Sequence, residues 1–85
     1  MPRSRTSRYD RNYRELLAML RQRREDAGVT QKELAKRMRT TQSVISKLEM
    51  GVVRIDLVEL LGYLKGIEAD PVAFIRDFRE KIGES

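Results

Sequence analysis

The apolar residues of this chain recur every three or four positions, the spacing that places them on one face of an α-helix. The first such segment runs from about Asp10 to Ala27, and Gly28 after it is a common helix terminator. Its apolar face consists of Tyr13, Leu16, Leu17 and Leu20. Arg24 falls on the same face one turn later, where a charged side chain either needs a partner or extends along the edge of the apolar surface.

Residues 30–51 are predicted to form two short helices separated by a break. Thr30 and Glu33 have the spacing of a capping box at the start of the first helix. A pair of threonines follows this helix, and Thr41 offers a second N-cap. Gly51 can adopt the left-handed conformation that ends the second helix. Two helices joined by a break of three or four residues form a helix-turn-helix.

Two more helices are predicted after this motif. Asp56 and Glu59 form another possible capping box, ahead of a strongly apolar helix that we expect to cross the core and to end near Gly66. Its core residues are expected to be Leu57, Leu60, Leu61 and Leu64. Asp70 followed by proline begins a last helix over about residues 70–82. The apolar ridge of that helix consists of Phe74, Ile75, Phe78 and Ile82. No strand-like alternation appears, so the predicted fold class is all-α with five helices.

Composition argues against several classes of function. With 85 residues the chain forms one small domain, which has no room for a separate catalytic or sensor unit. It has no cysteine, no histidine, no glycine-rich phosphate loop and no cluster of carboxylates. We therefore expect no enzymatic activity, no metal and no cofactor. No apolar run reaches the length of a membrane span and no secretory signal is present, so we expect a cytoplasmic protein.

The positive charge is unevenly distributed. The formal net charge is +5, and residues 1–14 carry five arginines against one aspartate. Residues 30–54 carry six basic and two acidic residues, whereas residues 55–85 carry four basic and seven acidic residues. A basic N-terminus and a basic central motif are typical of a protein that binds a polyanion, although a solvated helical surface can also be basic.

The first nine residues have no apolar periodicity and are rich in arginine and serine. We expect residues 1–9 to be a flexible basic arm and residues 10–85 to be the folded domain. Arms of this kind can contact DNA phosphates or the minor groove, and Arg3 and Arg5 are the candidates here.

The central motif resembles a known family. The residues that carry the resemblance are Thr30, Gln31, Leu34, Ala35, Thr41, Gln42, Ile45, Ser46, Glu49 and Gly51. They match the pattern of the lambda-repressor-like (Cro/Xre) DNA-binding domains, and the resemblance covers about Asn12 to Phe78. It implies a five-helix fold, a prokaryotic or phage-encoded transcriptional regulator, association with the nucleoid, and double-stranded DNA as the partner. It also implies that Arg24 pairs with Glu49.

The outward face of the second motif helix is the candidate for reading bases. If Ile45 and Leu48 face inward, its polar side chains face outward, and no acidic residue lies between Glu33 and Glu49. The amide of glutamine has the donor and acceptor that pair with N7 and N6 of adenine. Serine can form hydrogen bonds with several base edges, and lysine can donate to guanine or to a phosphate. With the resemblance, the expected base-reading residues are Thr41, Gln42, Ser43, Ser46 and Lys47. The expected phosphate contacts are Gln31, Lys32, Arg39, Arg54, Arg3 and Arg5.

Three features depart from the family pattern. Arg39 occupies the turn position where the family usually has glycine, so the turn is either strained or differently shaped. Met50, Val52 and Val53 replace residues that are often polar or basic. Ile55 stands where proline is common. This apolar stretch can be a cover for the core or part of a protein–protein surface, and we favour core cover for Ile55.

The last helix suggests self-association. A chain this small cannot easily cover the whole ridge of Phe74, Ile75, Phe78 and Ile82, so we expect a homodimer through these residues and a palindromic operator. The competing view is that Phe74 and Phe78 are used fully inside the monomer and that dimers form only on DNA. The expected function is a sequence-specific repressor or controller. The alternative is an interaction module with the same fold, such as an antitoxin that neutralises a partner protein.

Overall fold

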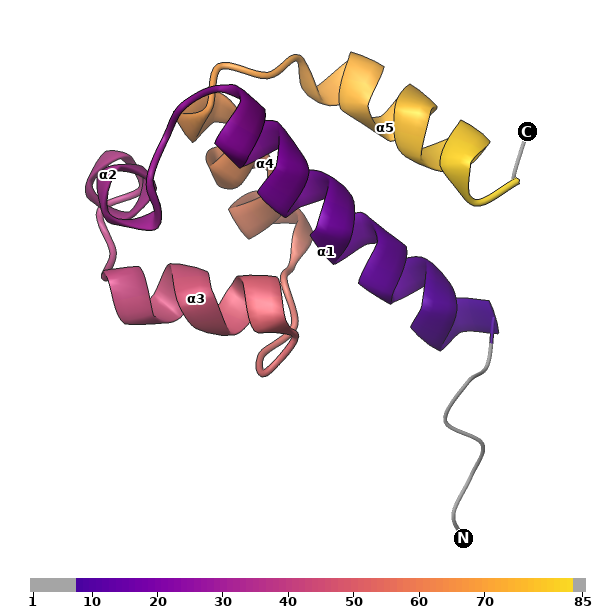
Figure 1. Ribbon diagram of the computed structural model, residues 1–85, viewed down its shortest axis with the longest axis horizontal. Coiled ribbons are helices and arrows are strands. Elements are labelled where there is room, and N and C mark those ends of the chain that lie inside the picture. Colours follow the sequence, from indigo (N-terminus) through magenta and orange to yellow (C-terminus); the bar gives the residue numbers. More distant parts are fainter. Residues whose placement is uncertain (1–7, 84–85) are drawn as a thin grey trace, which may run out of the picture.

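The computed structural model describes residues 8–83, which form five α-helices and no strands (Figure 1). The helices are α1 (Arg8–Asp26), α2 (Gln31–Arg37), α3 (Gln42–Met50), α4 (Leu57–Gly66) and α5 (Pro71–Lys81). The predicted all-α, five-helix fold class is confirmed. α1 begins at Arg8, two residues before the expected Asp10. Polar residues at a helix end add nothing to an apolar repeat, so the pattern could not show them.

The helices pack around α1, the longest of them. α1 contacts α3 and α5, and these two helices lie on opposite sides of it in Figure 1. α2 contacts α3 and α4, and α4 in turn contacts α5. The N-terminal half of α1 extends past the C-terminal end of α3 (Figure 1). Among residues 8–83 no helix is both long enough and apolar enough to cross a membrane.

The core is built from all five helices. Its largest fully buried side chains are Leu20, Leu34, Ile45, Tyr63, Leu64 and Phe74. Ile55, in the segment before α4, packs against this core, as predicted. Met50, Val52 and Val53 are exposed instead of covering the core.

The buried face of α4 differs in part from the predicted one, of which Leu60 and Leu64 are buried as expected. Leu57 and Leu61 were expected in the core, but they are 67% and 46% exposed. The buried face contains Leu60, Tyr63, Leu64 and Ile67. This set has the same i, i+3, i+4, i+7 spacing as the predicted set of leucines. Because α4 is apolar on several sides, spacing alone could not decide which face is buried.

Gly66 allows α4 to approach α2 closely. It is the last residue of α4, and a Cβ at this position would overlap Cδ1 of Leu34. The Nη1 atom of Arg37 donates a hydrogen bond of 2.6 Å to the Gly66 carbonyl. The chain adopts its left-handed conformation two residues later, at Glu68, whose φ is 59°. Gly66 therefore serves helix packing.

The prediction that Phe74 lies in a dimer interface is wrong. Its side chain is only 1% exposed, because α5 docks on the core through this residue. The Arg23 guanidinium lies 5.4 Å from the centre of the Phe74 ring and also pairs with Asp77 at 3.2 Å. Ile75 is 39% exposed, whereas Phe78 and Ile82 are half-buried.

Candidate nucleic-acid interface

Both motif helices begin at side-chain caps. The Thr30 hydroxyl accepts from the Glu33 N–H at 3.0 Å, and the Glu33 carboxylate accepts from the Thr30 N–H at 3.0 Å. This donation from the Thr30 backbone lowers the pKa of Glu33 below its ordinary value. The Thr41 hydroxyl caps α3 by accepting from the Val44 N–H at 3.3 Å. The caps fix where α2 and α3 start and hence which side chains each helix presents.

The turn between α2 and α3 passes through a left-handed residue. Arg39 has φ 59°, so the turn keeps the glycine-type conformation although arginine occupies the position. The Thr40 N–H donates to the Ala35 carbonyl at 2.9 Å and closes the end of α2. A left-handed residue with a Cβ costs about 1 kcal/mol or more, so this turn is strained. The Arg39 side chain is exposed.

The outward face of α3 carries the expected polar residues. Ile45 and Leu48 are buried, while Thr41, Gln42, Ser43 and Lys47 are exposed and Ser46 is half-buried. Met50 is also exposed on α3, one turn beyond the lysine. It was not among the predicted base-reading residues. Its spacing of four and seven positions from Ser46 and Ser43 places it on the same face.

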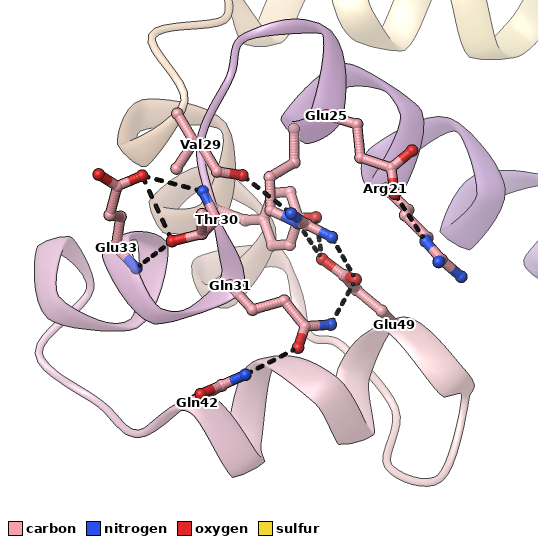
Figure 2. Close-up of polar contacts among 10 residues, drawn as sticks. Arg21, Glu25, Val29, Thr30, Gln31, Glu33, Gln42 and Glu49 are labelled. Atoms are coloured by element: carbon pink, nitrogen blue, oxygen red, sulfur yellow. Dashed lines mark hydrogen bonds and ion pairs between the residues drawn. The ribbon is translucent and has the colours of Figure 1, made fainter.

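The centre of the site is the carboxylate of Glu49, to which three other helices donate hydrogen bonds (Figure 2). Arg24 from α1 donates through Nε at 2.7 Å and through Nη2 at 3.1 Å, which makes a bidentate ion pair. Gln31 from α2 donates at 2.9 Å, and the Tyr63 hydroxyl from α4 donates at 2.6 Å. The side chains of Arg24 and Glu49 are only 8% and 3% exposed. A fully hydrogen-bonded ion pair of this kind joins four helices around one residue.

The charges of this pair are stabilised by its hydrogen bonds. Burial alone would raise the pKa of Glu49, but the donors on Arg24, Tyr63 and Gln31 together hold it below its usual range. The hydrogen bond to Glu49 raises the pKa of Arg24 against the effect of burial. The Nη1 atom of Arg24 also donates to the Val29 carbonyl at 2.8 Å. Both residues are therefore charged at neutral pH.

Tyr63 is a member of this network that the sequence interpretation missed. It is completely buried, and burial followed by its hydrogen bond to Glu49 raises its pKa. A signal was available in the sequence. Tyr63 lies three residues after Leu60, and a buried tyrosine hydroxyl nearly always has a partner. The identity of that partner depends on the tertiary fold.

The network continues from the buried ion pair to the exposed end of α3. Nε2 of Gln42 lies 3.5 Å from Oε1 of Gln31, at the long limit of a hydrogen bond (Figure 2). Gln31 in turn donates to Glu49. The exposed amide of Gln42 is thus connected through one half-buried side chain to the buried ion pair.

The predicted phosphate contacts surround this face. Lys32, Arg39 and Arg54 are exposed, and Gln31 is half-buried within the network. The Arg54 guanidinium lies 4.3 Å from the centre of the Tyr13 ring. Arg3 and Arg5 lie outside the residues that the structure describes. Lys32, Arg39 and Arg54 thus lie on the motif or on the loop that follows it.

Comparison with known proteins assigns the family. A family model described as helix-turn-helix matches residues 20–71. A solved structure of an XRE-family like protein from Pseudomonas syringae pv. tomato is 37% identical. The match covers 86% of this chain and 89% of that one, with a TM-score of 0.83. No curated protein matches the chain. The chain therefore belongs to the Cro/Xre-type helix-turn-helix family of DNA-binding regulators.

Proposed function

We propose that this protein is a sequence-specific transcriptional repressor that inserts α3 into the major groove of double-stranded DNA. The observation that carries this proposal is the chain of hydrogen bonds from Gln42 through Gln31 to Glu49. The contact of 3.5 Å between Gln42 and Gln31 is long for a hydrogen bond, but it gives the exposed Gln42 amide a partner that can orient it. A base-reading group held in place before binding loses less entropy when it binds.

Each residue of the face has a chemical role in this proposal. The side-chain amide of Gln42 can donate a hydrogen bond to N7 of adenine and accept one from its N6 amino group. Lys47 can donate a hydrogen bond to guanine or to a phosphate. The hydroxyl groups of Ser43 and Ser46 can form hydrogen bonds with either a donor or an acceptor on a base edge. The methyl group of Thr41 can contact a thymine methyl. Gln31, Lys32, Arg39 and Arg54 are the proposed phosphate contacts, which position the helix without reading sequence.

We also propose that the protein binds a palindromic operator as a homodimer. The apolar residues that α4 and α5 expose are Leu57, Val58, Leu61, Val72 and Ile75. We call this set the α4–α5 apolar surface. Leu61, Val72 and Ile75 line one hollow together with Pro71, Arg76 and Arg79, whereas Val58 lines a different hollow. A dimer with its two-fold axis at this surface would bury these apolar side chains. It would also present two copies of α3, which must lie about 34 Å apart to occupy successive major grooves.

The test is selection of bound duplexes from a random DNA library, followed by titration of the enriched site. Gln42→Ala should weaken binding to that site by about 1–3 kcal/mol and relax the preference at one base pair. Binding to unrelated DNA should hardly change. Gln22→Ala is a matched control, because it removes an exposed glutamine from α1. If Gln42→Ala weakens both kinds of binding equally, Gln42 does not read bases.

A second function is favoured by the exposed apolar residues. The α4–α5 apolar surface, together with Met50, Val52 and Val53, offers contact area for a protein partner. An interaction module of this kind would bind a partner protein and neutralise it, as an antitoxin does. Salt dependence separates the two functions, because log K for duplex DNA falls linearly with log salt when phosphates are neutralised.

A further inference from the structure

Tyr13 and Arg54 form a junction between α1 and the loop that follows α3. The Tyr13 hydroxyl accepts a hydrogen bond of 3.0 Å from the backbone N–H of Ile55. The ring of the same tyrosine lies under the Arg54 guanidinium, whose central carbon is 4.3 Å from the ring centre. One side chain of α1 therefore holds both the backbone and the cation of this loop.

The stack restricts Arg54 without occupying its donors. A guanidinium over an aromatic ring is attracted through its flat face, and its N–H groups point outward in the plane of the group. Among residues 8–83, Arg54 donates no hydrogen bond and forms no ion pair. The side chain is also exposed. Arg54 is thus an ordered cation whose hydrogen-bond donors remain available to a ligand.

Several other arginines of the described chain are already engaged. Arg21 pairs with Glu25, Arg23 with Asp77 and Arg24 with Glu49. Arg37 donates to the Gly66 carbonyl. These contacts stabilise the fold and reduce the affinity of each arginine for an external anion. Arg23 also lies over an aromatic ring, that of Phe74, but it has an acidic partner as well, whereas Arg54 is oriented by the Tyr13 ring and pairs with no described carboxylate.

The location of the junction relates it to α3. Arg54 lies four residues after Met50, at the opposite end of the helix from Gln42. Leu17 of α1 supports the start of the loop, since a Cβ at Gly51 would lie 3.3 Å from Cδ1 of this leucine. The N-terminal half of α1 extends past this end of α3 (Figure 1). A DNA backbone that follows α3 in the major groove would pass the junction on one flank.

We propose that Tyr13 is a positioning residue that holds Arg54 ready to contact a DNA backbone phosphate beside the base pairs read by α3. This inference rests on the proposed DNA-binding function and adds to it a residue outside the motif. A planar guanidinium suits the two oxygens of a phosphate, and the stack reduces the conformational freedom that the side chain must lose on binding.

The experiment measures the affinity of the full chain for its selected duplex at several salt concentrations. Arg54→Ala should reduce the slope of log K against log salt by about one unit, since one phosphate contact is lost. Tyr13→Leu should keep most of the slope but weaken binding roughly threefold to tenfold, because Arg54 is no longer ordered. Tyr13→Leu made in the Arg54→Ala background should cause little further loss.

Tyr13→Phe keeps the ring and removes only the hydroxyl. It should weaken binding by about threefold, and this loss too should disappear in the Arg54→Ala background. The phenylalanine variant supplies the double-mutant cycle if the leucine variant fails to fold, which thermal unfolding of each variant will show. Losses that simply add in the double variants would overturn the positioning role of Tyr13.

Two other results would separate this inference from the function on which it rests. If the wild-type chain binds duplex DNA with a clear salt dependence but Arg54→Ala leaves the slope unchanged, Arg54 makes no phosphate contact and the inference is wrong. If the wild-type chain shows no salt-dependent binding to any duplex, the proposed function fails, and the inference fails with it.

Discussion

Arg39 shows how a single residue combines a structural cost with a proposed role. Its φ of 59° lies in the left-handed region, where a side chain with a Cβ is disfavoured by about 1 kcal/mol or more. Its exposed guanidinium, however, lies in the turn that leads into α3. Stability alone would favour glycine at this position, whereas phosphate binding would favour the cation.

Arg39→Gly should therefore change stability and binding in opposite directions. The free energy of unfolding should rise by about 1 kcal/mol, which corresponds to a Tm increase of about 4–8 °C for a domain of this size. The slope of log K against log salt for duplex DNA should fall by about one unit, because one cation is lost. Thermal unfolding and DNA titration measure the two effects.

Glu68 provides the matched control for this prediction. It is the other described residue with a side chain and a positive φ, also 59°, but it follows α4. Glu68→Gly should raise stability in the same way and cause no loss of DNA affinity. A variant Arg39→Gly that binds DNA with an unchanged salt slope would show that Arg39 does not contact phosphate.

At the residue scale, the sequence predicted what depends on near neighbours. The caps at Thr30 and Thr41 and the left-handed Gly51 were predictable because their partners lie within four residues. The hydrogen bond from Tyr63 to Glu49 and the contact of Tyr13 with the Arg54–Ile55 loop join segments that are distant in sequence. One sequence contains no direct signal for such pairs.

At the element scale, the number of helices was easier to predict than their orientation. α4 begins at the predicted Asp56 cap and has the predicted length. Leu60 and Leu64 are buried as predicted, but the prediction was wrong for the other two leucines, because the choice between two apolar faces depends on α2 and α5, against which α4 packs. The observed face includes Tyr63, whose hydroxyl donates a hydrogen bond to Glu49, a contact that the spacing of the leucines could not show.

The ion pair of Arg24 and Glu49 ties α1 to α3, so its removal should weaken the packing of the whole motif. Each single substitution, Arg24→Met or Glu49→Leu, should lower the free energy of unfolding by about 3–5 kcal/mol, because it leaves an uncompensated buried charge. The double variant should lose less than the two single variants combined. A double-mutant cycle in chemical denaturation measures this coupling, and negligible coupling would mean that the pair does not hold the helices together.

The same pair makes an acid-sensitive contribution. Because the folded-state pKa of Glu49 lies below its ordinary value of 4.5, its stabilising effect is complete above that value. The effect is lost as the pH falls through the lowered folded-state pKa. The double variant should therefore lose less stability than the wild type between neutral pH and the acid range. Glu33, whose pKa is also lowered, remains in both proteins, so its contribution cancels in the comparison.

At the scale of the whole molecule, the fold class and the location of basic residues were predictable, but the surface available to a second copy was not. The docking of α5 buries Phe74 and leaves Ile75 exposed. Which side of α5 is buried depends in part on the ion pair between Arg23 of α1 and Asp77 of α5, which joins the two helices. The prediction of a homodimer therefore moves from the Phe74 ridge to the α4–α5 apolar surface.

Sedimentation at micromolar concentration without DNA tests the dimer. Val72→Lys should abolish self-association and leave the unfolding transition nearly unchanged, because Val72 is exposed in the monomer and its charge would be buried in the dimer. Val52→Lys is the matched control, since this exposed valine lies in the loop after α3. It should leave the sedimentation coefficient unchanged. Phe74→Ala should instead destabilise the monomer by about 3–5 kcal/mol, as expected for a buried aromatic side chain.

A dimer should also bind a palindromic operator more tightly than one half-site, whereas a monomer should not. If the α4–α5 apolar surface joins two copies, Val72→Lys should weaken binding to a palindromic operator far more than binding to one half-site, because the second recognition helix no longer acts at a raised local concentration. The half-site affinity should be close to that of the wild type, since α3 is unaltered. A wild-type chain that sediments as a monomer and binds both duplexes with equal affinity would exclude the dimer, and the exposed apolar surface would then need another partner.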